Sequence, residues 1–587
     1  MTSIWIILTL ALPIGGALAV WLIGDHRPRA QHIAAVTAAV AAAAAALGMA
    51  LFATGGAPLQ LAGGTIYGPI EFRPDGLGVL LAVIAAVVGC LSVVFSVDYM
   101  HGEHGLGRYY GLVLLFIAAM VGLVLSDNLL VLFVFWEITA LCSYALISFY
   151  NDDPRAVAGG IKALIITQVG GVGLLAGALL MHAYFETYSI STFLARAGDL
   201  PPAVLGLVAF GFLVAAIAKS AQVPLHSWLP DAMEAPTPVS ALIHAATMVN
   251  AGVYLLARFY PAFAPVPGWT TAVVIVGVLS ALGAGLMALM ANDLKRVLAY
   301  STISQLGFMV YAVGTGAIFA SQFHLLSHAV FKALLFLAAG AIIHEVGTRD
   351  LRQMGGLGRE MPFVRNAFVI GALALAGVPL FNGFFSKDLL LEAGYGQGPA
   401  WAYWTMLATA GLTALYAARV TWLVFFAPDQ RKRDAKDAPV MMKLSLGVLA
   451  VGAVTTWLLA GPLSQALAST LPLHGVRVVS TLEMVVEVFS APLTYLALLA
   501  LALGLAAWWW RGRLAGVASR LGPLARAAAA GFGFDQLNDA VVGFTQRVAA
   551  ALALTQTGQL NWNIAGLLGG LVLVLAILTA VSLAWRG

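Results

Sequence analysis

The sequence predicts an all-α polytopic membrane protein with about 16 transmembrane helices. Hydrophobic residues make up 61% of the 587 residues, and the mean hydropathy is +0.93. A water-soluble chain does not bury that much apolar surface. In addition, apolar runs of about 18 residues or more recur along the chain, and each is long enough to cross a bilayer.

The first run, residues 4–23, lacks a basic start and a small-residue cleavage site, so we expect a retained span and not a removable signal peptide. The span near residue 375 contains Pro379, Asn382 and Gly383, which predict an interrupted helix. The expected spans centre near residues 13, 42, 87, 117, 138, 171, 212, 248, 280, 304, 330, 375, 414, 451, 500 and 574.

Basic residues are distributed unequally between the odd- and even-numbered loops that connect these spans. Most fall in odd-numbered loops, including the cluster Arg431-Lys432-Arg433, and the even-numbered loops hold only Arg73, Arg196, Arg258 and Arg477. By the positive-inside rule, both termini are expected on the non-cytoplasmic side of the inner (plasma) membrane.

Three lysines, Lys219, Lys332 and Lys387, lie inside apolar stretches although only 10% of the chain is charged. A charge at the centre of a membrane helix costs roughly 2.5 to 3.5 kcal/mol on insertion scales, so such groups indicate ion or proton paths first. Lys219 precedes Pro224 and Pro230, and Lys387 follows Pro379. Interrupted helices in corresponding halves predict two inverted repeats, although membrane helices also tolerate Pro and Gly without any repeat.

Glu137 follows Trp136 in an apolar run with no cation within one helical turn in sequence. Its carboxylate must therefore pair across helices or take up a proton, and Lys219 is the natural partner. A Glu–Lys contact that opens and closes would release and capture a proton, whereas a static ion pair would only hold two helices together.

His324, His328 and Lys332 recur at four-residue steps, which places them on one helix face. Such a ladder suits stepwise proton transfer; the alternatives are a metal or haem site and hydrogen-bonded packing. His244 is a candidate bridge between this ladder and Lys219.

Lys387 and Asp388 lie at the second interrupted helix, where an exit gate and a helix-end ion pair are equally compatible with the sequence. Lys295 follows Asp293 and is typical of a positive-inside anchor.

No cofactor, metal or nucleic acid is expected in this chain. Cys90 and Cys142 fall within expected spans without a ligand-like spacing, and no glycine-rich nucleotide loop follows a strand. The sequence therefore predicts no redox or hydrolytic site of its own, and whether the chain is an enzyme subunit stays open.

Between about Gly111 and Glu392, the chain resembles the antiporter-like superfamily of complex I membrane subunits, Mrp Na⁺/H⁺ antiporters and related membrane-bound hydrogenases. It is most similar to the distal complex I pump subunit and the large Mrp subunit. The strings that carry the resemblance are Phe135-Trp-Glu137, Lys219-Ser-Ala-Gln, Trp228-Leu-Pro-Asp-Ala-Met, Pro236-Thr-Pro-Val-Ser, Asp293-Leu-Lys-Arg and His324 through Lys332.

The resemblance implies roles for individual residues. Glu137 and Lys219 would form a switching pair, and Lys387 would face the exit. His244, Lys295, His328 and Lys332 would form a central hydrophilic axis. The implied regions are N-terminal helices (1–108), a first repeat (109–260), a second repeat (261–428) and C-terminal helices (429–587) with a short lateral amphipathic helix near 533–556.

The implied function is a proton-translocating subunit of a multisubunit energy-coupling complex, with Na⁺/H⁺ exchange as a further activity. Other membrane subunits would be its partners, and complex I-like and Mrp-like assemblies remain equal alternatives. A second candidate is a proton-channel subunit coupled to a soluble partner, such as an inorganic-carbon uptake protein. A third is a purely structural membrane anchor.

Overall fold

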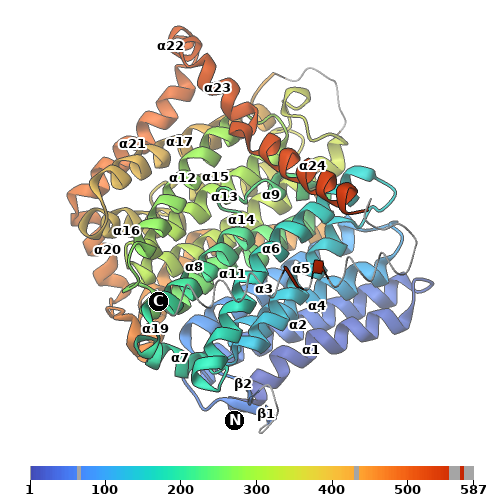
Figure 1. Cartoon of the computed structure of the whole chain (residues 1–587). Helices are drawn as coiled ribbons and strands as arrows, with labels where there is room; N and C mark the ends of the chain where they lie inside the picture. Colours follow the sequence, from blue (N-terminus) through green and yellow to red (C-terminus); the bar gives the residue numbers. More distant parts are fainter. Residues whose placement is uncertain (1, 63–67, 429–434, 554–568, 571, 574–587) are drawn as a thin grey trace. The chain divides into compact units, whose positions relative to one another are not determined.

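The computed structural model describes residues 2–62, 68–428, 435–553, 569–570 and 572–573 (Figure 1). The chain forms two compact units, residues 1–529 and residues 530–587, which are treated separately below. This grouping does not test the four regions expected from the sequence, and their boundaries stay a prediction.

Within the described residues, fourteen helical segments are long and apolar enough to cross a membrane. They are α1 (Thr2–Ile23), α2 (Pro28–Phe52), α3 (Gly76–Tyr99), α4 (Leu106–Leu125), α5 (Leu129–Ile147), α6 (Pro154–Phe185), α8 (Pro202–Lys219), α10 to α11 (Thr237–Phe263), α12 (Trp269–Met290), α13 (Leu294–Gly314), α14 (Ile318–Val346), α17 (Ala400–Phe425), α18 to α19 (Val440–Thr470) and α21 (Pro492–Trp509). The chain is a multi-pass α-helical membrane protein.

The predicted count of 16 is not confirmed. The span expected near residue 375 is divided between α15 (Pro362–Ala376) and α16 (Asn382–Gln397), each too short to cross a bilayer alone. The span expected near residue 574 lies outside the described residues.

Two of the expected interruptions are present. The helix α8 stops at Lys219, and the chain resumes with the short α9 (Trp228–Asp231). Between α15 and α16, Gly377 and Leu380 have φ values of +86° and +80°, which no α-helix contains. A third irregularity, the π-helical turn η3 (Leu242–Ala246), was not predicted. Non-helical backbone at membrane depth is tolerated where it is buried in protein or lines a wet cavity.

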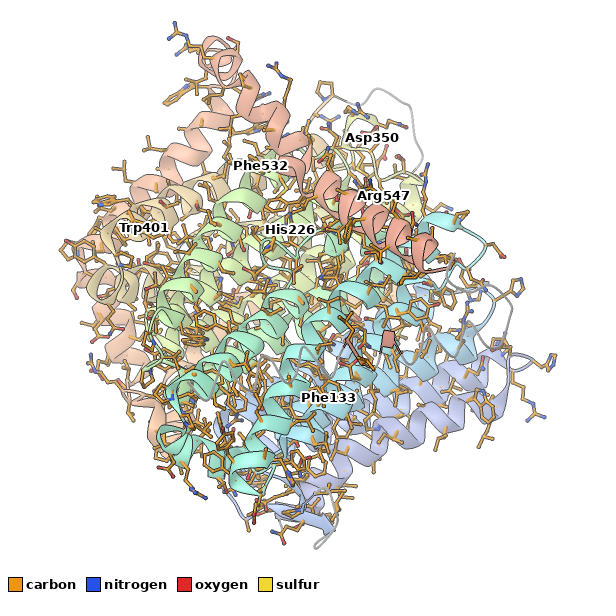
Figure 2. The ribbon with its side chains drawn as sticks, viewed as in Figure 1. Phe133, His226, Asp350, Trp401, Phe532 and Arg547 are labelled. Atoms are coloured by element: carbon orange, nitrogen blue, oxygen red, sulfur yellow. The ribbon has the colours of Figure 1, made fainter. Side chains whose placement is uncertain are left out.

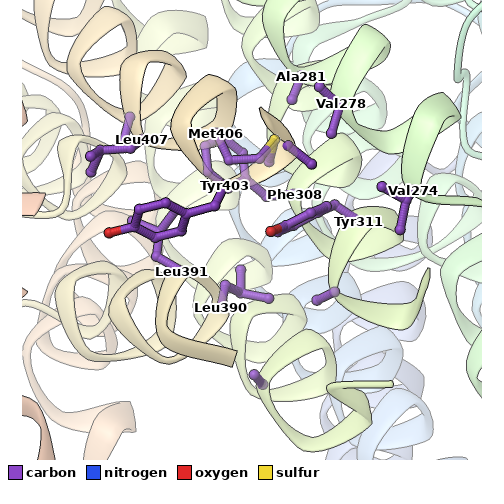
Figure 3. Packing of buried hydrophobic residues seen from close by; sticks show 14 residues of the cluster. Val274, Val278, Ala281, Phe308, Tyr311, Leu390, Leu391, Tyr403, Met406 and Leu407 are labelled. Atoms are coloured by element: carbon purple, nitrogen blue, oxygen red, sulfur yellow. The ribbon is translucent and has the colours of Figure 1, made fainter. Parts of the chain in front are cut away.

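The second interrupted helix is held in place by apolar packing. Figure 3 shows Leu390 and Leu391 of α16 beside Tyr403 and Met406 of α17 and Tyr311 of α13, in one buried cluster. Close approach of α12 and α13 supports this cluster, because a Cβ at Gly277 would lie only 2.5 Å from the main-chain N of Tyr311. The packing fixes the depth at which α16 presents its polar residues.

A small sheet departs from the all-α expectation. The strands β1 (Leu59–Ala62) and β2 (Ile70–Phe72) pair antiparallel between α2 and α3. They are too short and too polar at Gln60 and Glu71 to give a clear strand pattern in the sequence.

Smaller helices complete the first unit: α7 (Ile190–Arg196), α20 (Thr481–Ser490), α22 (Ala515–Arg520) and α23 (Gly522–Ala529). The second unit contains α24 (Phe534–Ala553), on which Figure 2 labels Arg547. Leu537, Val541, Phe544 and Val548 recur on α24 at three- and four-residue steps, so this helix is amphipathic as expected. Its lateral orientation stays a prediction.

Candidate functional site

Lys219 is the last residue of α8, and its side chain is fully buried. Its Nζ donates a hydrogen bond of 2.8 Å to the main-chain O of Trp136 on α5, and it lies 4.9 Å from the centroid of the Trp136 ring. The lysine therefore reaches α5 immediately beside Glu137. The contact is made at the end of α8, where the chain leaves the helix after Lys219.

Glu137 is on α5 and points toward α6. A Cβ at Gly171 would lie 2.6 Å from Oε1 of Glu137, so glycine leaves the room that the carboxylate occupies. This oxygen is buried and accepts no hydrogen bond from the described residues. The charges of Glu137 and Lys219 act on each other, but no ion pair within 4.0 Å joins them in the part of the chain that the structure describes. The two predicted partners are therefore neighbours that do not form a direct ion pair.

The predicted ladder lies on α14, and His324, His328 and Lys332 are all fully buried. Because Oε1 of Gln305 only accepts, Nε2 of His324 donates to it at 3.2 Å, and Nδ1 lies 3.0 Å from Oγ of Ser386 on α16. His324 thus links α13 to the second interrupted helix.

His328 and His244 have no such links. Neither nitrogen of either ring has a hydrogen-bond partner among the described residues. The ring of His328 meets Phe331 edge-on, and His244 stacks on Phe336 at 4.9 Å between centroids. Buried imidazole nitrogens are rarely left without partners, so these positions indicate sites for ordered water.

Lys332 donates hydrogen bonds to Oγ of Ser301 and, at 3.1 Å, to the main-chain O of Leu298. Both acceptors are on α13 and both are neutral. The packing of α13 against α14 therefore positions the ammonium beside neutral acceptors.

Lys387 and Asp388 are neighbours in sequence on α16, yet they bind different partners. Nζ of Lys387 donates to the main-chain O of Leu375 at 2.7 Å, across the break between α15 and α16. The carboxylate of Asp388 accepts a hydrogen bond of 2.8 Å from Oγ1 of Thr494 on α21. A helix-end ion pair between Lys387 and Asp388 is absent among the described contacts.

Lys295, at the start of α13, is buried, and its Nζ donates to the main-chain O of Ala235 at 2.6 Å. Its burial differs from that of an exposed basic anchor. Two other cations nearby are less buried and form ion pairs: Arg296 pairs with Asp231 at 3.2 Å, and Arg349 pairs with Glu234 at 2.9 Å.

The four buried lysines share one property. Each donates to a neutral acceptor, and none forms an ion pair within the described part of the chain. Sequence reasoning missed the polar atoms that accompany them, whose only signal was an amide or histidine in an apolar helix. Buried side-chain atoms without a described partner include Oε1 of Gln222, Oδ1 of Asn250, Nε2 of Gln305 and both amide atoms of Gln322.

The described residues contain no group of three or more His, Cys, Asp or Glu side chains placed to hold a metal ion. The fold and this site define a class: a polytopic membrane protein with a buried series of basic groups next to interrupted helices.

Two family descriptions match the sequence. Residues 126–413 match "NADH:quinone oxidoreductase/Mrp antiporter, TM", and residues 61–110 match "NADH-Ubiquinone oxidoreductase (complex I), chain 5 N-terminus".

Individual relatives come from both branches. The chain is 40% identical over 423 residues to the Na⁺/H⁺ antiporter subunit A1 of Staphylococcus haemolyticus, covering 67% of this chain and 53% of that protein. It is 42% identical over 379 residues to the NAD(P)H-quinone oxidoreductase chain 5 of a Synechocystis species, covering 62% of this chain and 56% of that protein. The chain thus spans about half the length of the curated relatives it matches.

Solved structures agree with these matches. A chain of the Mrp complex from Dietzia sp. DQ12-45-1b has a TM-score of 0.82 at 29% identity, covering 98% of this chain and 63% of that one. A chain of the archaeal membrane-bound sulfane sulfur reductase has a TM-score of 0.70 at 26% identity, covering 86% of this chain and 98% of that one. The protein belongs to the antiporter-like superfamily of complex I and Mrp membrane subunits.

Proposed function

We propose that this chain is a proton-translocating subunit of a multisubunit, energy-coupling membrane complex. The observation that carries the proposal is the set of four buried lysines held by neutral acceptors. An ammonium in that setting releases and recaptures a proton without first breaking an ion pair, whereas a lysine kept for stability is normally paired. The purely structural anchor fits this set poorly.

The proposed path follows the electrostatic neighbours. Lys295 and Lys332 act on His244; Lys332, His324 and His244 act on His328; and Lys387 acts on His324. We propose that these groups, each within electrostatic range of the next, form one series from Lys295 to Lys387. Lys219 interacts with Glu137. The amide oxygens Oε1 of Gln222 and Oδ1 of Asn250 have no partner among the described residues, and they supply polar positions for the water that would link Lys219 to the series.

Each group has a role in this proposal. Glu137 modulates the proton on Lys219, the histidines and Lys332 relay protons, and Lys387 with Asp388 exchanges them with the far side. Asp388 accepts a hydrogen bond from Thr494 and follows Lys387 directly in the sequence of α16, so we assign it to the same exchange site.

Na⁺/H⁺ exchange is the specific activity that the antiporter relatives suggest, and coupling to quinone chemistry is what the complex I relatives suggest. We further propose a plasma-membrane location, with both termini on the non-cytoplasmic side as the positive-inside rule indicates. The inorganic-carbon alternative has the same proton path with a soluble partner.

The assembly is tested by purifying the tagged chain from its native membrane in mild detergent and identifying the accompanying proteins by mass spectrometry. Flavin and iron–sulfur subunits would assign it to a redox-driven pump. Small membrane subunits alone would assign it to an antiporter, and Na⁺-dependent proton flux is then the next assay. A lone soluble partner would favour the third scheme, and recovery without any partner would contradict the proposal.

The first site is tested by Lys219→Ala and Glu137→Ala. Each is expected to reduce coupled transport by about 100-fold while the complex still assembles, because each removes a charge on which proton exchange depends. Transport is measured in inverted native vesicles with a pH-sensitive dye, and assembly by co-purification. Loss of assembly in both variants would indicate a structural role for these two residues instead.

A further inference from the structure

A groove between α1 and α4 is separate from the lysine series, which comprises Lys219, Lys295, Lys332 and Lys387. It has a volume of about 770 Å³ and is open to the surroundings of the protein. Its lining comprises Ile14, Ala17, Leu18, Trp21, Gly24 and Asp25 from α1 and the turn after it, and Gly107, Arg108, Gly111, Leu112 and Leu115 from α4, with Ala145 of α5.

The walls of the groove are apolar and run along the helices. Ile14, Leu18 and Trp21 recur at steps of three and four on α1, so they face the same way over roughly 10 Å at 1.5 Å per residue. The side chain of Trp21 is 70% exposed at the end of this run, where aromatic residues mark a membrane–water interface. Gly111 has no side chain and leaves open space on the α4 side of the groove. A Cβ added at Gly111 would approach nothing closer than the main-chain O of Ala17, at 3.8 Å.

The mouth of the groove holds two opposite charges at one end. Oδ1 of Asp25 accepts hydrogen bonds from the main-chain N of Gly107 at 2.8 Å and from Nε2 of Gln31 at 3.1 Å. Nη2 of Arg108 donates to the main-chain O of Phe149, and the guanidinium lies over the Phe149 ring, 4.8 Å from its centroid. Both charged groups are therefore held in place by the protein.

These two charges are not paired with each other. Within the described residues, no ion pair joins Asp25 to Arg108, and Oδ2 of Asp25 and the Nε and Nη1 of Arg108 have no hydrogen-bond partner. The mouth thus offers two nitrogen donors, Nε and Nη1 of Arg108, and one carboxylate oxygen, Oδ2 of Asp25. All three lie next to the apolar groove.

We propose that this groove binds one phosphatidylethanolamine molecule, with its phosphate on Arg108, its ammonium on Asp25 and one acyl chain along α1 and α4. The charges decide the headgroup. Arginine recognises phosphate through charge-assisted hydrogen bonds, and the primary ammonium has N–H groups that the carboxylate accepts. A choline headgroup has no N–H to donate, and an anionic headgroup would meet the carboxylate of Asp25. This site is independent of the proposed proton path.

The test uses the full chain, purified in mild detergent, stripped of lipid and offered phosphatidylethanolamine, phosphatidylglycerol or phosphatidylcholine before native mass spectrometry. Wild type is expected to retain one phosphatidylethanolamine and at least about tenfold less of the other two, as expected when one charged hydrogen bond decides binding. Equal retention of all three lipids would overturn the proposal, because it would show unspecific binding of acyl chains.

Single variants distinguish the contributions of Arg108 and Asp25 to lipid binding. Arg108→Ala is expected to lower bound phosphatidylethanolamine about tenfold, whereas Arg29→Ala, an exposed basic side chain near the same end, leaves it unchanged. Asp25→Asn keeps an acceptor for Gly107 and is expected to abolish the preference for phosphatidylethanolamine over phosphatidylglycerol. Equal effects of Arg108→Ala and Arg29→Ala would contradict the proposed phosphate contact.

The groove itself is tested by Gly111→Leu, which places a large side chain in the lining of the groove, one helical turn from Arg108. It is expected to reduce bound lipid as strongly as Arg108→Ala while the elution volume of the protein stays the same. Unchanged lipid binding by this variant would place the lipid elsewhere. Release of a co-purifying polypeptide in place of lipid would assign the groove to a partner helix and overturn the proposal.

Discussion

Two regions of this protein bury charge in opposite ways. Near one end of α11 (Met248–Phe263), Arg258 is held by both oxygens of Asp75, at 2.6 and 2.8 Å, and both side chains are almost fully buried. In the lysine series, Lys219, Lys295, Lys332 and Lys387 are equally buried but donate to neutral oxygens.

Under the proposed function, this difference separates a structural charge from an exchangeable one. A bidentate pair satisfies both ions and stays closed, because breaking it leaves an uncompensated charge in a dry environment. A lysine bound to main-chain carbonyls keeps its position whether or not it is protonated. The pairing of a buried cation therefore indicates its task more clearly than its burial does.

The largest expected effect comes from breaking the closed pair. Arg258→Ala leaves the carboxylate of Asp75 buried without a counter-ion and is expected to lower the free energy of unfolding by about 3 to 5 kcal/mol. Thermal unfolding of the purified chain measures this loss. Transport per folded molecule should be retained.

The matched control is Arg477→Ala. This arginine also bridges two carboxylates, Glu483 and Glu487, but its side chain is 67% exposed. The expected change is below about 1 kcal/mol, as for other surface pairs. Similar destabilisation by both variants would remove the distinction on which this comparison depends.

The next effect is a pH dependence of stability. His474 lies outside the expected spans and donates from Nε2 to the main-chain O of Ala257 and of Arg258. Burial, together with the nearby positive charge of Arg258, lowers the pKa of His474 to about 4. The folded protein therefore holds the neutral imidazole.

In the unfolded chain, His474 has the ordinary histidine pKa of about 6.5. The neutral, buried His474 therefore makes its full contribution to the free energy of unfolding above that pH. It is lost as the pH falls from about 6.5 through 4, and amounts to up to about 3 kcal/mol. Thermal unfolding of wild type and of His474→Gln across this range checks it. Parallel pH profiles of the two proteins would refute the assignment.

The smallest expected effect concerns Asp388, which lies beside Lys387 without pairing with it. Asp388→Asn keeps the hydrogen bond from Thr494 but removes the charge, and is expected to lower proton flux about tenfold. Thr494→Val removes the hydrogen bond and keeps the charge, and should have a weaker effect. A stronger loss with Thr494→Val than with Asp388→Asn would show that Asp388 only positions α16.

Local patterns in the sequence predicted much of the fold. Apolar runs located the spans, and four-residue spacing placed His324, His328 and Lys332 on one helix, because both signals depend only on neighbours in the chain. The proline near residue 380 likewise indicated the interruption between α15 and α16. These features need no knowledge of tertiary contacts.

Long-range partners could not be predicted in this way. The carbonyl groups of Trp136, Ala235, Leu298 and Leu375 accept from the lysines, and a main-chain oxygen has no signature in a sequence. Arg258 was assigned to a loop, whereas it lies within α11 and pairs with Asp75, 183 positions away. Lys295 resembled a basic anchor by its position, and only packing of α13 against the segment around Ala235 buries it.

The central claim is that the unpaired lysines carry protons, and Lys332→Arg tests it most directly. A guanidinium keeps the positive charge and does not release its proton, so flux should fall by about 100-fold while folding and assembly persist. The measurement is proton flux in vesicles containing the purified complex, with Lys436→Arg, an exposed position, as the control. Flux within twofold of wild type would contradict a proton-carrying Lys332 and would leave this lysine a structural group.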